Sequence, residues 1–324
     1  MDYNKDIILE SNLAIRRNIK GYDFPTTMTY DESLVIIDIF KNIFEDRLVL
    51  LSDLDDPTID RLIEKMVLSP DCREKLGKIG LVFEGNTTLV INDRDHLSIN
   101  ISDFGENLQS AYMRANEIEK VMDERIDFAF SPELGYLTSH GRNTGAGLEI
   151  SYKTFLFGLI DDPKTYYGFK QALIYAGMYV KRFVPKELKS YADDIYLIKN
   201  YGNYRDDIYL YLDEVAKNME TIVKNEIKFR RDYKILNDTD DREIQEDIKI
   251  IENNLGASLY TSLEKMVKAL YDLKKYLILG YESKFSMDDL DFLIKKIEST
   301  DYKGNFDQDR LKFLEEYIGD KNGK

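Results

Sequence analysis

A glycine-rich loop that contains a histidine is the first feature that could carry chemistry. Residues 139–147 read SHGRNTGAG, and glycines let a backbone approach a phosphate closely. The loop matches neither a P-loop nor a dinucleotide-binding fingerprint, so a purely structural loop is the alternative. His140 could act as a general base, because its ordinary pKa lies near neutrality. A histidine in a polar loop also commonly does no more than form hydrogen bonds with solvent.

The cysteine and the paired aspartates are weaker candidates. Cys72, the single cysteine, has no histidine near it in the sequence and is expected to be a quiet thiol. One cysteine excludes a disulfide framework and a cysteine-based zinc site, and two histidines argue against a histidine-rich metal site. Three aspartate pairs are better explained as helix caps and solvated faces than as catalytic dyads: Asp193-Asp194, Asp206-Asp207 and Asp288-Asp289.

The composition predicts a soluble globular protein of about two domains. The 324 residues are 43% hydrophobic and 32% charged, and no stretch approaches the roughly 18 apolar residues of a membrane span. Acidic residues outnumber basic ones, 60 to 45, for a net charge of −15. This charge argues against direct nucleic-acid binding, which needs concentrated Lys and Arg. The polar N-terminus is unlike a secretory signal, and a cytoplasmic location is expected.

The apolar spacing predicts an α+β domain over residues 1–234. Helical spacing occurs at 33–44, 62–68, 106–123, 165–176 and 208–231, with a short helical turn at 71–76. Strand-like runs occur at 79–83, 88–91, 96–101, 128–130, 136–138, 178–184 and 195–198. The first two runs flank Glu84-Gly85-Asn86, which is typical of a hairpin.

A small all-helical domain is expected over residues 235–324. Residues 237–241 read NDTDD, which suits a linker or a helix cap. Helices are predicted at 259–279, 287–299 and 311–318 from the spacing of their apolar residues.

Three motifs connect the chain to a known family. Residues 10–25 read ESNLAIRRNIKGYDFP, residues 92–98 read NDRDHLS, and residues 128–148 read FAFSPELGYLTSHGRNTGAGL. In order and spacing they resemble the bacterial protein-arginine kinases (the McsB family), which are relatives of creatine and arginine kinases. The likeness continues through 176–184 to the C-terminal helices and covers nearly the whole chain. It implies a phosphagen-kinase-like domain, an antiparallel sheet flanked by helices, followed by a small helical domain.

The resemblance also implies a reaction. Enzymes of this family transfer the γ-phosphoryl group of Mg-ATP to a guanidinium nitrogen. A set of arginines clamps the phosphates, a glutamate orients the guanidinium, and a cysteine thiolate lies next to the acceptor.

The phosphate clamp of the family is not preserved here. The positions of four of its arginines are occupied by Asn12, Ala14, Ser98 and Glu149. A further arginine corresponds to Lys181, or to Arg182 if the register shifts by one residue. Arg17 is kept in a neighbouring motif but is not one of the clamp arginines.

The acceptor side is altered as well. Arg94 occupies the position of the catalytic glutamate and would repel a cationic guanidinium. His140 replaces the active cysteine, so no catalytic position is intact. In the C-terminal domain, Gln308 and Asp309 correspond to the Arg-Asp pair of the family's phosphoarginine site and are possible remnants of it. Capping of a short helix is the alternative role of Asp309.

These replacements predict a pseudokinase. One charge pair about 4 Å apart is worth about 4 kcal/mol at an effective dielectric of about 20. Millimolar to micromolar affinity amounts to about 4–8 kcal/mol, so the loss of several arginines should abolish ATP binding. No cofactor is therefore expected, and Arg94 and Glu149 are predicted to form an ion pair across the vacated site.

Two other interpretations stay open. Positive charge supplied from new places could rebuild the site for Mg-ATP, leaving a divergent active ATP:guanido phosphotransferase; the available cations are Arg94, Arg142, Lys153, Lys181 and Arg182. The same charges could instead bind another anion without catalysis. For the pseudokinase, the family implies a regulatory or scaffolding role in protein quality control. Its expected partners are an active paralogue, a zinc-containing activator or the Clp unfoldase machinery, and a homodimer is also expected.

Overall fold

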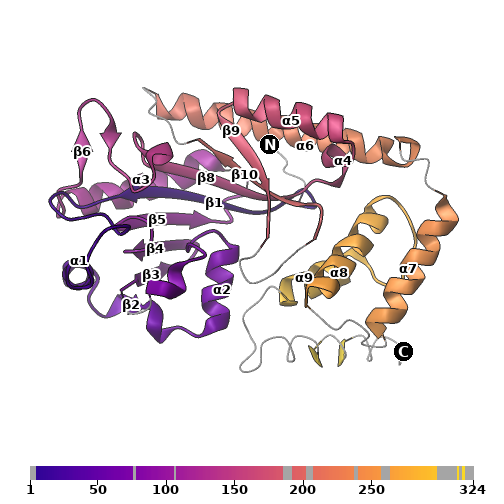
Figure 1. The fold of residues 1–324 in the computed structure, drawn as a ribbon, viewed down its shortest axis with the longest axis horizontal. Coiled ribbons are helices and arrows are strands. Elements are labelled where there is room, and N and C mark those ends of the chain that lie inside the picture. The colour runs from indigo at the N-terminus through magenta and orange to yellow at the C-terminus, as the bar shows by residue number, and fades with distance from the viewer. Residues whose placement is uncertain are drawn as a thin grey trace.

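The chain folds around one antiparallel sheet. The computed structural model describes residues 5–75, 78–105, 107–184, 192–201, 207–236, 240–256, 263–297, 312–313 and 316–317 (Figure 1). The sheet has eight strands in the order β2-β3-β4-β5-β1-β8-β10-β9. Their bounds are β1 Ile8–Arg17, β2 Val49–Leu50, β3 Gly80–Glu84, β4 Thr87–Ile91, β5 Leu97–Ser102, β8 Leu148–Phe155, β9 Met178–Arg182 and β10 Ile195–Asn200. A small hairpin, β6 Phe130–Ser131 and β7 Gly135–Tyr136, stands apart from the sheet.

Helices surround the sheet and continue beyond it. The first group comprises α1 Tyr30–Phe44, α2 Asp56–Glu64, α3 Leu108–Asp123, α4 Phe157–Ile160, α5 Pro163–Tyr175 and α6 Ile208–Leu236. The second comprises α7 Asp241–Gly256, α8 Leu263–Ile278 and α9 Met287–Ile297, which lie together at one end of the sheet (Figure 1). No helix in the described ranges is both long and apolar enough to cross a membrane. The predicted fold class is confirmed.

The two faces of the sheet differ in chemistry. Alternate residues of the central strands, such as Leu13, Ile99 and Ile150, are buried in the main hydrophobic core. Residues of α3 and α6, including Ala115 and Met219, belong to the same core. Because side chains alternate across a strand, the residues between them point to the opposite face. That opposite face is largely polar in β5, β1 and β8.

The sequence pattern missed the two central strands, β1 and β8. Both are buried along most of their length, and β8 is buried at all eight positions. Their second face carries polar or charged residues, among them Asn12, Arg16, Glu149 and Lys153, which are also buried. Residues 148–153 of β8 (LEISYK) alternate apolar with polar side chains, a strand signal that the prediction above does not use. What hydropathy cannot reveal is that the polar face is buried.

Three predicted elements, one helix and two strands, have wrong boundaries. The helix expected at 62–68 is α2, which begins and ends earlier. Asp55 caps it by accepting a hydrogen bond from the Thr58 amide, and Pro57 occupies its first turn. Met66 then adopts a left-handed backbone (φ 63°), which ends the helical path before Ser69-Pro70. The strands expected at 128–130 and 136–138 are the shorter β6 and β7.

The C-terminal helices share a hydrophobic cluster with the sheet. Phe155 and Leu197 of the sheet pack in it with Leu270 of α8 and Leu293 of α9. An ion pair of 3.4 Å between Lys275 and Asp194 spans the same junction. The division at 234/235 remains a prediction, and α6 runs across it. The 237–239 part of the predicted linker, together with Gln308 and Asp309, lies outside the described residues, and of 311–318 only 312–313 and 316–317 are described.

The junction contains an aspartate that should make stability depend on pH. Burial raises the pKa of Asp272 to about 6. The positive charges of Lys268 and Lys275 lower this pKa only in part, and the negative charge of Asp194 raises it further. A carboxyl whose pKa is raised by folding favours the folded state below its unfolded pKa, and this contribution is lost as the pH rises through about 6. We expect Asp272→Asn to raise the melting temperature at pH 7 by about 1–3 °C and to have no effect near pH 4. Thermal unfolding across this pH range measures it, and an equal effect at both ends would contradict the assignment.

Candidate functional site

Strand pairing brings the predicted clamp positions together on the polar face of the sheet. Ala14 of β1 pairs with Asn100 of β5 on one side and with Glu149 of β8 on the other. Arg16 pairs with Ser98 in the same way. Directly paired residues of antiparallel strands point to the same face. Asn12, Ala14, Ser98 and Glu149 therefore share one surface although they come from three strands that lie far apart in the chain.

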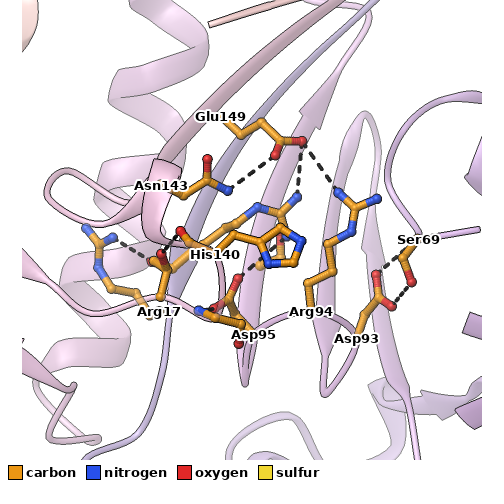
Figure 2. Close-up of polar contacts among 12 residues, drawn as sticks. Arg17, Ser69, Asp93, Arg94, Asp95, His140, Asn143 and Glu149 are labelled. Carbon is orange, nitrogen blue, oxygen red and sulfur yellow. Dashed lines mark hydrogen bonds and ion pairs between the residues drawn. The ribbon is translucent and has the colours of Figure 1, made fainter. Parts of the chain in front are cut away.

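Glu149 is the centre of this surface. Its Oε1 lies 2.9 Å from Lys199 Nζ, 3.4 Å from Arg16 Nη2 and 3.7 Å from Arg94 Nη1. Asn143 Nδ2 donates a hydrogen bond of 3.3 Å to Oε2. Figure 2 shows Asn143 and Arg94 reaching the carboxylate from two different loops. The predicted ion pair of Arg94 with Glu149 is confirmed, and two further cations join it.

The electrostatics keep this carboxylate charged although it is buried. Burial alone would raise the pKa of Glu149, but Lys199, Arg16 and Arg94 together hold that pKa well below its usual range. Lys199 shows the reverse balance: burial lowers its pKa, and Glu149 offsets part of that effect. Arg16 is 1% exposed, so the cluster is a desolvated ionic network and not a surface ion pair.

Arg94 is held in place by its neighbours in the β4–β5 loop. The Asp93 carboxylate accepts a hydrogen bond of 2.8 Å from the Ser69 amide and a second from the Ser69 hydroxyl. Asp95 accepts bonds of 2.7 Å from Asn18 Nδ2 and from the Ser139 amide, which ties this loop to the glycine-rich loop. Two anchored residues thus flank Arg94 and fix where its side chain leaves the backbone (Figure 2).

The adjacent histidine has a structural role. His96 is fully buried; its Nδ1 accepts from the Ile19 amide at 2.9 Å, and its Nε2 lies 3.0 Å from the Asp23 carbonyl oxygen. This arrangement fits the neutral tautomer that donates through Nε2. Burial lowers the pKa of His96, which also favours the neutral ring.

The glycine-rich loop is a tightly packed structural loop. Gly135 (φ +78°) lies so close to it that an added Cβ would be 2.6 Å from the Gly145 carbonyl oxygen. From beneath, Arg17 donates 3.0 Å to the Ala146 carbonyl oxygen, forms an ion pair of 2.9 Å with Glu119 and stacks on the ring of Tyr136. Arg17 therefore supports the loop from the apolar side of the sheet and has no access to the polar face.

His140 begins the short 3-10 turn Gly141–Asn143 of this loop and is exposed. Its carbonyl oxygen accepts bonds of 2.8 Å from Thr138 Oγ1 and from the Asn143 amide. Its ring has no hydrogen bond or ion pair within the described part of the chain. No base or acid orients the ring, so a catalytic role has no support in the surrounding contacts.

The register of β9 shows which of Lys181 and Arg182 lies on the polar face, where the family has its phosphate-binding arginine. Lys181 pairs with Leu197 and faces the polar side, where burial, Arg94 and Arg142 lower its pKa and Glu149 opposes them. Arg182 forms an ion pair with Asp193 on the other side. Lys153 also belongs to the polar side; it is fully buried, and its ammonium lies 4.7 Å from the centre of the Phe183 ring.

Sequence reasoning missed Arg16 and Lys199. Arg16 is adjacent to Arg17, and the two residues point to opposite faces because they are neighbours in a strand. Lys199 lies one residue beyond the strand predicted at 195–198, whereas the observed strand β10 includes it. The strand periodicity of β1 and β10 would have placed both on the face of Glu149, but the pairing of β8 with both strands had to be known first.

Burial makes the thiol of Cys72 inert. Cys72 is fully buried, and burial raises its pKa to about 12. Since the thiolate is the reactive form, we expect negligible labelling by a maleimide in the native protein near pH 7 and complete labelling after denaturation. Rapid labelling of the native protein would contradict this prediction.

Comparison with known proteins assigns the family. The family model of the ATP:guanido phosphotransferase C-terminal catalytic domain matches residues 34–234, more than half of the chain. The chain belongs to the ATP:guanido phosphotransferase family. It is 32% identical over 168 residues to a protein-arginine kinase of Caldanaerobacter subterraneus subsp. tengcongensis, covering 48% of this chain and 50% of the relative. It is 30% identical over 167 residues to the protein-arginine kinase of Bacillus mycoides, covering 48% and 47%. The matched region thus spans about half the length of these relatives.

Two solved structures share the fold of this chain. The duplicated taurocyamine kinase of Schistosoma mansoni superimposes with a TM-score of 0.58 at 17% identity, covering 70% of this chain and 34% of that one. A lombricine kinase gives a TM-score of 0.55 at 17% identity, covering 69% and 67%. At this level of identity the comparison concerns architecture alone.

The residues present do not fit the triphosphate of the family's nucleotide. The buried Glu149 carboxylate places a negative charge at the centre of the surface that would have to receive phosphates. Asn12 Nδ2 donates hydrogen bonds of 3.3 Å to the Met66 carbonyl oxygen and to Asn100 Oδ1, so its amide group is already used within the protein. The Ala14 side chain has no polar group to offer a phosphate. In the described ranges, no group of three or more His, Cys, Asp or Glu side chains could hold a metal ion.

Proposed function

We propose that this chain is a pseudokinase of the ATP:guanido phosphotransferase family that acts as a regulatory or scaffolding protein. The observation that carries the proposal is the Glu149 cluster. A buried carboxylate already binds the three cations Arg16, Arg94 and Lys199. An incoming phosphate would have to compete with this internal anion and would leave its charge buried nearby. A family member that binds nucleotide needs the opposite arrangement, with its cations free for the ligand.

The acceptor side supports the same proposal. Arg94, three-quarters buried, brings a fixed positive charge toward the site, which disfavours a guanidinium nearby. The one thiol of the chain is sealed in a separate hydrophobic cluster with Leu62, Val67 and Ile79. Neither a carboxylate base nor a reactive thiolate is thus available at the corresponding positions.

The relatives of the chain suggest where such a protein would act. Because they are protein-arginine kinases, we infer a role in bacterial protein quality control. We propose that the chain forms a heterodimer with an active paralogue, or binds the zinc-containing activator or the Clp unfoldase machinery. A homodimer of the chain is also proposed.

A second candidate function is a divergent, active phosphotransferase. Three buried polar atoms of the same face favour it, because they have no hydrogen-bond partner in the described part of the chain: Arg16 Nε, Ser98 Oγ and Ser151 Oγ. Buried polar groups are rarely left unpaired, so a bound polar species would satisfy them. Ordered water would do so equally well, and for that reason the pseudokinase is the preferred proposal.

Detection of phosphoarginine separates the two candidates. The purified protein is incubated with Mg-ATP and a basic protein substrate, and the products are analysed by mass spectrometry under non-acidic conditions, with an active protein-arginine kinase as the positive control. We expect no phosphoarginine on either protein. Phosphoarginine that disappears in Lys181→Ala or Arg94→Ala would instead establish the active phosphotransferase.

A further inference from the structure

Three cations gather at the open side of the Glu149 cluster. They are Arg94 of the β4–β5 loop, Arg142 of the glycine-rich loop and Lys181 of β9, called here the mouth cluster. Arg142 and Lys181 are exposed, and the Arg94 side chain is 25% exposed. Arg142 Nη1 lies 3.3 Å from the Tyr179 hydroxyl, two residues before Lys181 on the same strand. Lys181 is partly covered although its side chain reaches solvent, and this partial burial, together with Arg94 and Arg142, lowers its pKa, so the three charges act on one another.

The mouth cluster has too few counter-ions. Arg94 has one ion pair among the described residues, at 3.7 Å to Glu149, and that carboxylate is already shared with Arg16 and Lys199. Asp71 also attracts Arg94, but it lies within 3.9 Å of Lys75. Arg142 contacts the hydroxyl and ring of Tyr179, and neither Arg142 nor Lys181 has an ion pair within the described ranges. In a chain with a net charge of −15, this is a local excess of positive charge.

We propose that the mouth cluster is a docking site for an acidic segment of a partner protein, bound through its Asp or Glu carboxylates. The proposal rests on the pseudokinase function and names the chemistry of the partner. The three cations come from three separate elements, and Arg142 and Lys181 are exposed, so the carboxylates of a segment lying across the surface could reach them. The forked guanidinium groups of Arg94 and Arg142 match carboxylate geometry. The acidic surface elsewhere is screened beyond a Debye length of about 8 Å at physiological salt, so the local excess governs close contact.

Fluorescence anisotropy of a labelled octaglutamate peptide tests the proposal. Titrations at about 50 and 150 mM NaCl should show binding that weakens with salt, because the contacts are partly exposed. The double variant Arg142→Gln/Lys181→Gln should bind about fivefold more weakly or worse. Both side chains are exposed, so the fold should persist, and thermal unfolding verifies this. The matched control Lys20→Gln/Lys224→Gln removes two exposed cations elsewhere, which are 68% and 71% exposed, and should bind like the parent protein.

Three results would overturn the proposal: no binding at the lower salt, equal affinity of the two double variants, or complete displacement of the peptide by millimolar inorganic phosphate. The last result would assign the cluster to small oxyanions. The peptide titration contains no nucleotide, so its outcome is independent of catalysis. Phosphoarginine formation together with intact peptide binding would disprove the pseudokinase and leave the acidic docking site standing.

Discussion

Replacing Glu149 with glutamine is expected to lower the free energy of unfolding by about 3–5 kcal/mol, because it removes the counter-ion of buried Lys199 and leaves buried Arg16 with Asp95 alone, at 3.9 Å. Arg16 and Lys199 are both nearly inaccessible to water and share this one carboxylate at 3.4 and 2.9 Å. Glutamine keeps the size of the side chain, so the change isolates the charge. Urea unfolding measures the free energy, and the melting temperature should fall by roughly 10 °C.

The pH dependence of this effect has a definite sign. Folding lowers the pKa of Glu149, so its stabilising contribution is complete above the unfolded value of 4.5 and is lost as the pH falls through the lower folded value. The difference between the parent protein and Glu149→Gln should therefore be constant between pH 6 and 8 and shrink in acid. Glu133→Gln, in the exposed hairpin tip, is the control and should change stability by less than about 0.5 kcal/mol. A loss below about 1 kcal/mol for Glu149→Gln would show that the cluster is not a desolvated network.

Glu226→Ala should destabilise the protein by about 3–5 kcal/mol as well, because Glu226 is the fully buried partner of an ion pair inside α6. Its carboxylate accepts 2.7 Å from Arg230 Nε, 2.9 Å from the Gly158 amide and 2.8 Å from the Leu159 amide. Arg230 in turn donates 2.8 Å to the Phe155 carbonyl oxygen. Removal of the carboxylate leaves a buried guanidinium without its counter-ion and two amide groups unsatisfied, and α4 loses these hydrogen bonds to α6.

The same helix provides the control for this second prediction. Lys224 and Glu220 have the same spacing of four residues and a shorter distance of 2.6 Å, but the lysine is 71% exposed. Glu220→Ala should cost less than about 0.5 kcal/mol, because exposed ion pairs in helices contribute little. Both variants are compared by urea unfolding. Equal effects of the two substitutions would mean that burial does not determine the energy of these pairs.

The parts of the fold that hydropathy predicted are those with ordinary amphipathic patterns. The hairpin of β3 and β4 was visible because apolar runs flank Gly85-Asn86, and α6 because its apolar residues follow the helical period. The strand β1 escaped because its sequence, ILESNLAIRR, alternates irregularly, whereas the alternation in β8, LEISYK, was a usable signal. Hydropathy could not show that the polar face of both strands is buried. A buried Arg16 or Lys153 looks like a surface residue in a hydropathy pattern, and only the tertiary contacts show otherwise.

The candidate site was predictable in part from the motifs. Their correspondence to the family identified Glu149 and Arg94 and suggested that the two would pair, as they do at 3.7 Å. Lys199 was out of reach, because its proximity to Glu149 depends on the pairing of β10 with β8, where Lys199 lies opposite Ser151. From the sequence, the charge on Arg94 could only suggest that it repels a guanidinium acceptor. The structure was needed to show that Arg16, Arg94 and Lys199 share the Glu149 carboxylate.

Thermal unfolding with and without millimolar Mg-ATP tests the central claim most directly. A ligand present at about 100 times its dissociation constant stabilises the folded state by about 2.7 kcal/mol, which raises the melting temperature by several degrees. We expect no shift for this protein, and a clear shift for an active protein-arginine kinase measured alongside it. A shift of several degrees for this protein, lost in Lys181→Ala, would contradict the pseudokinase and show that the nucleotide site has been rebuilt.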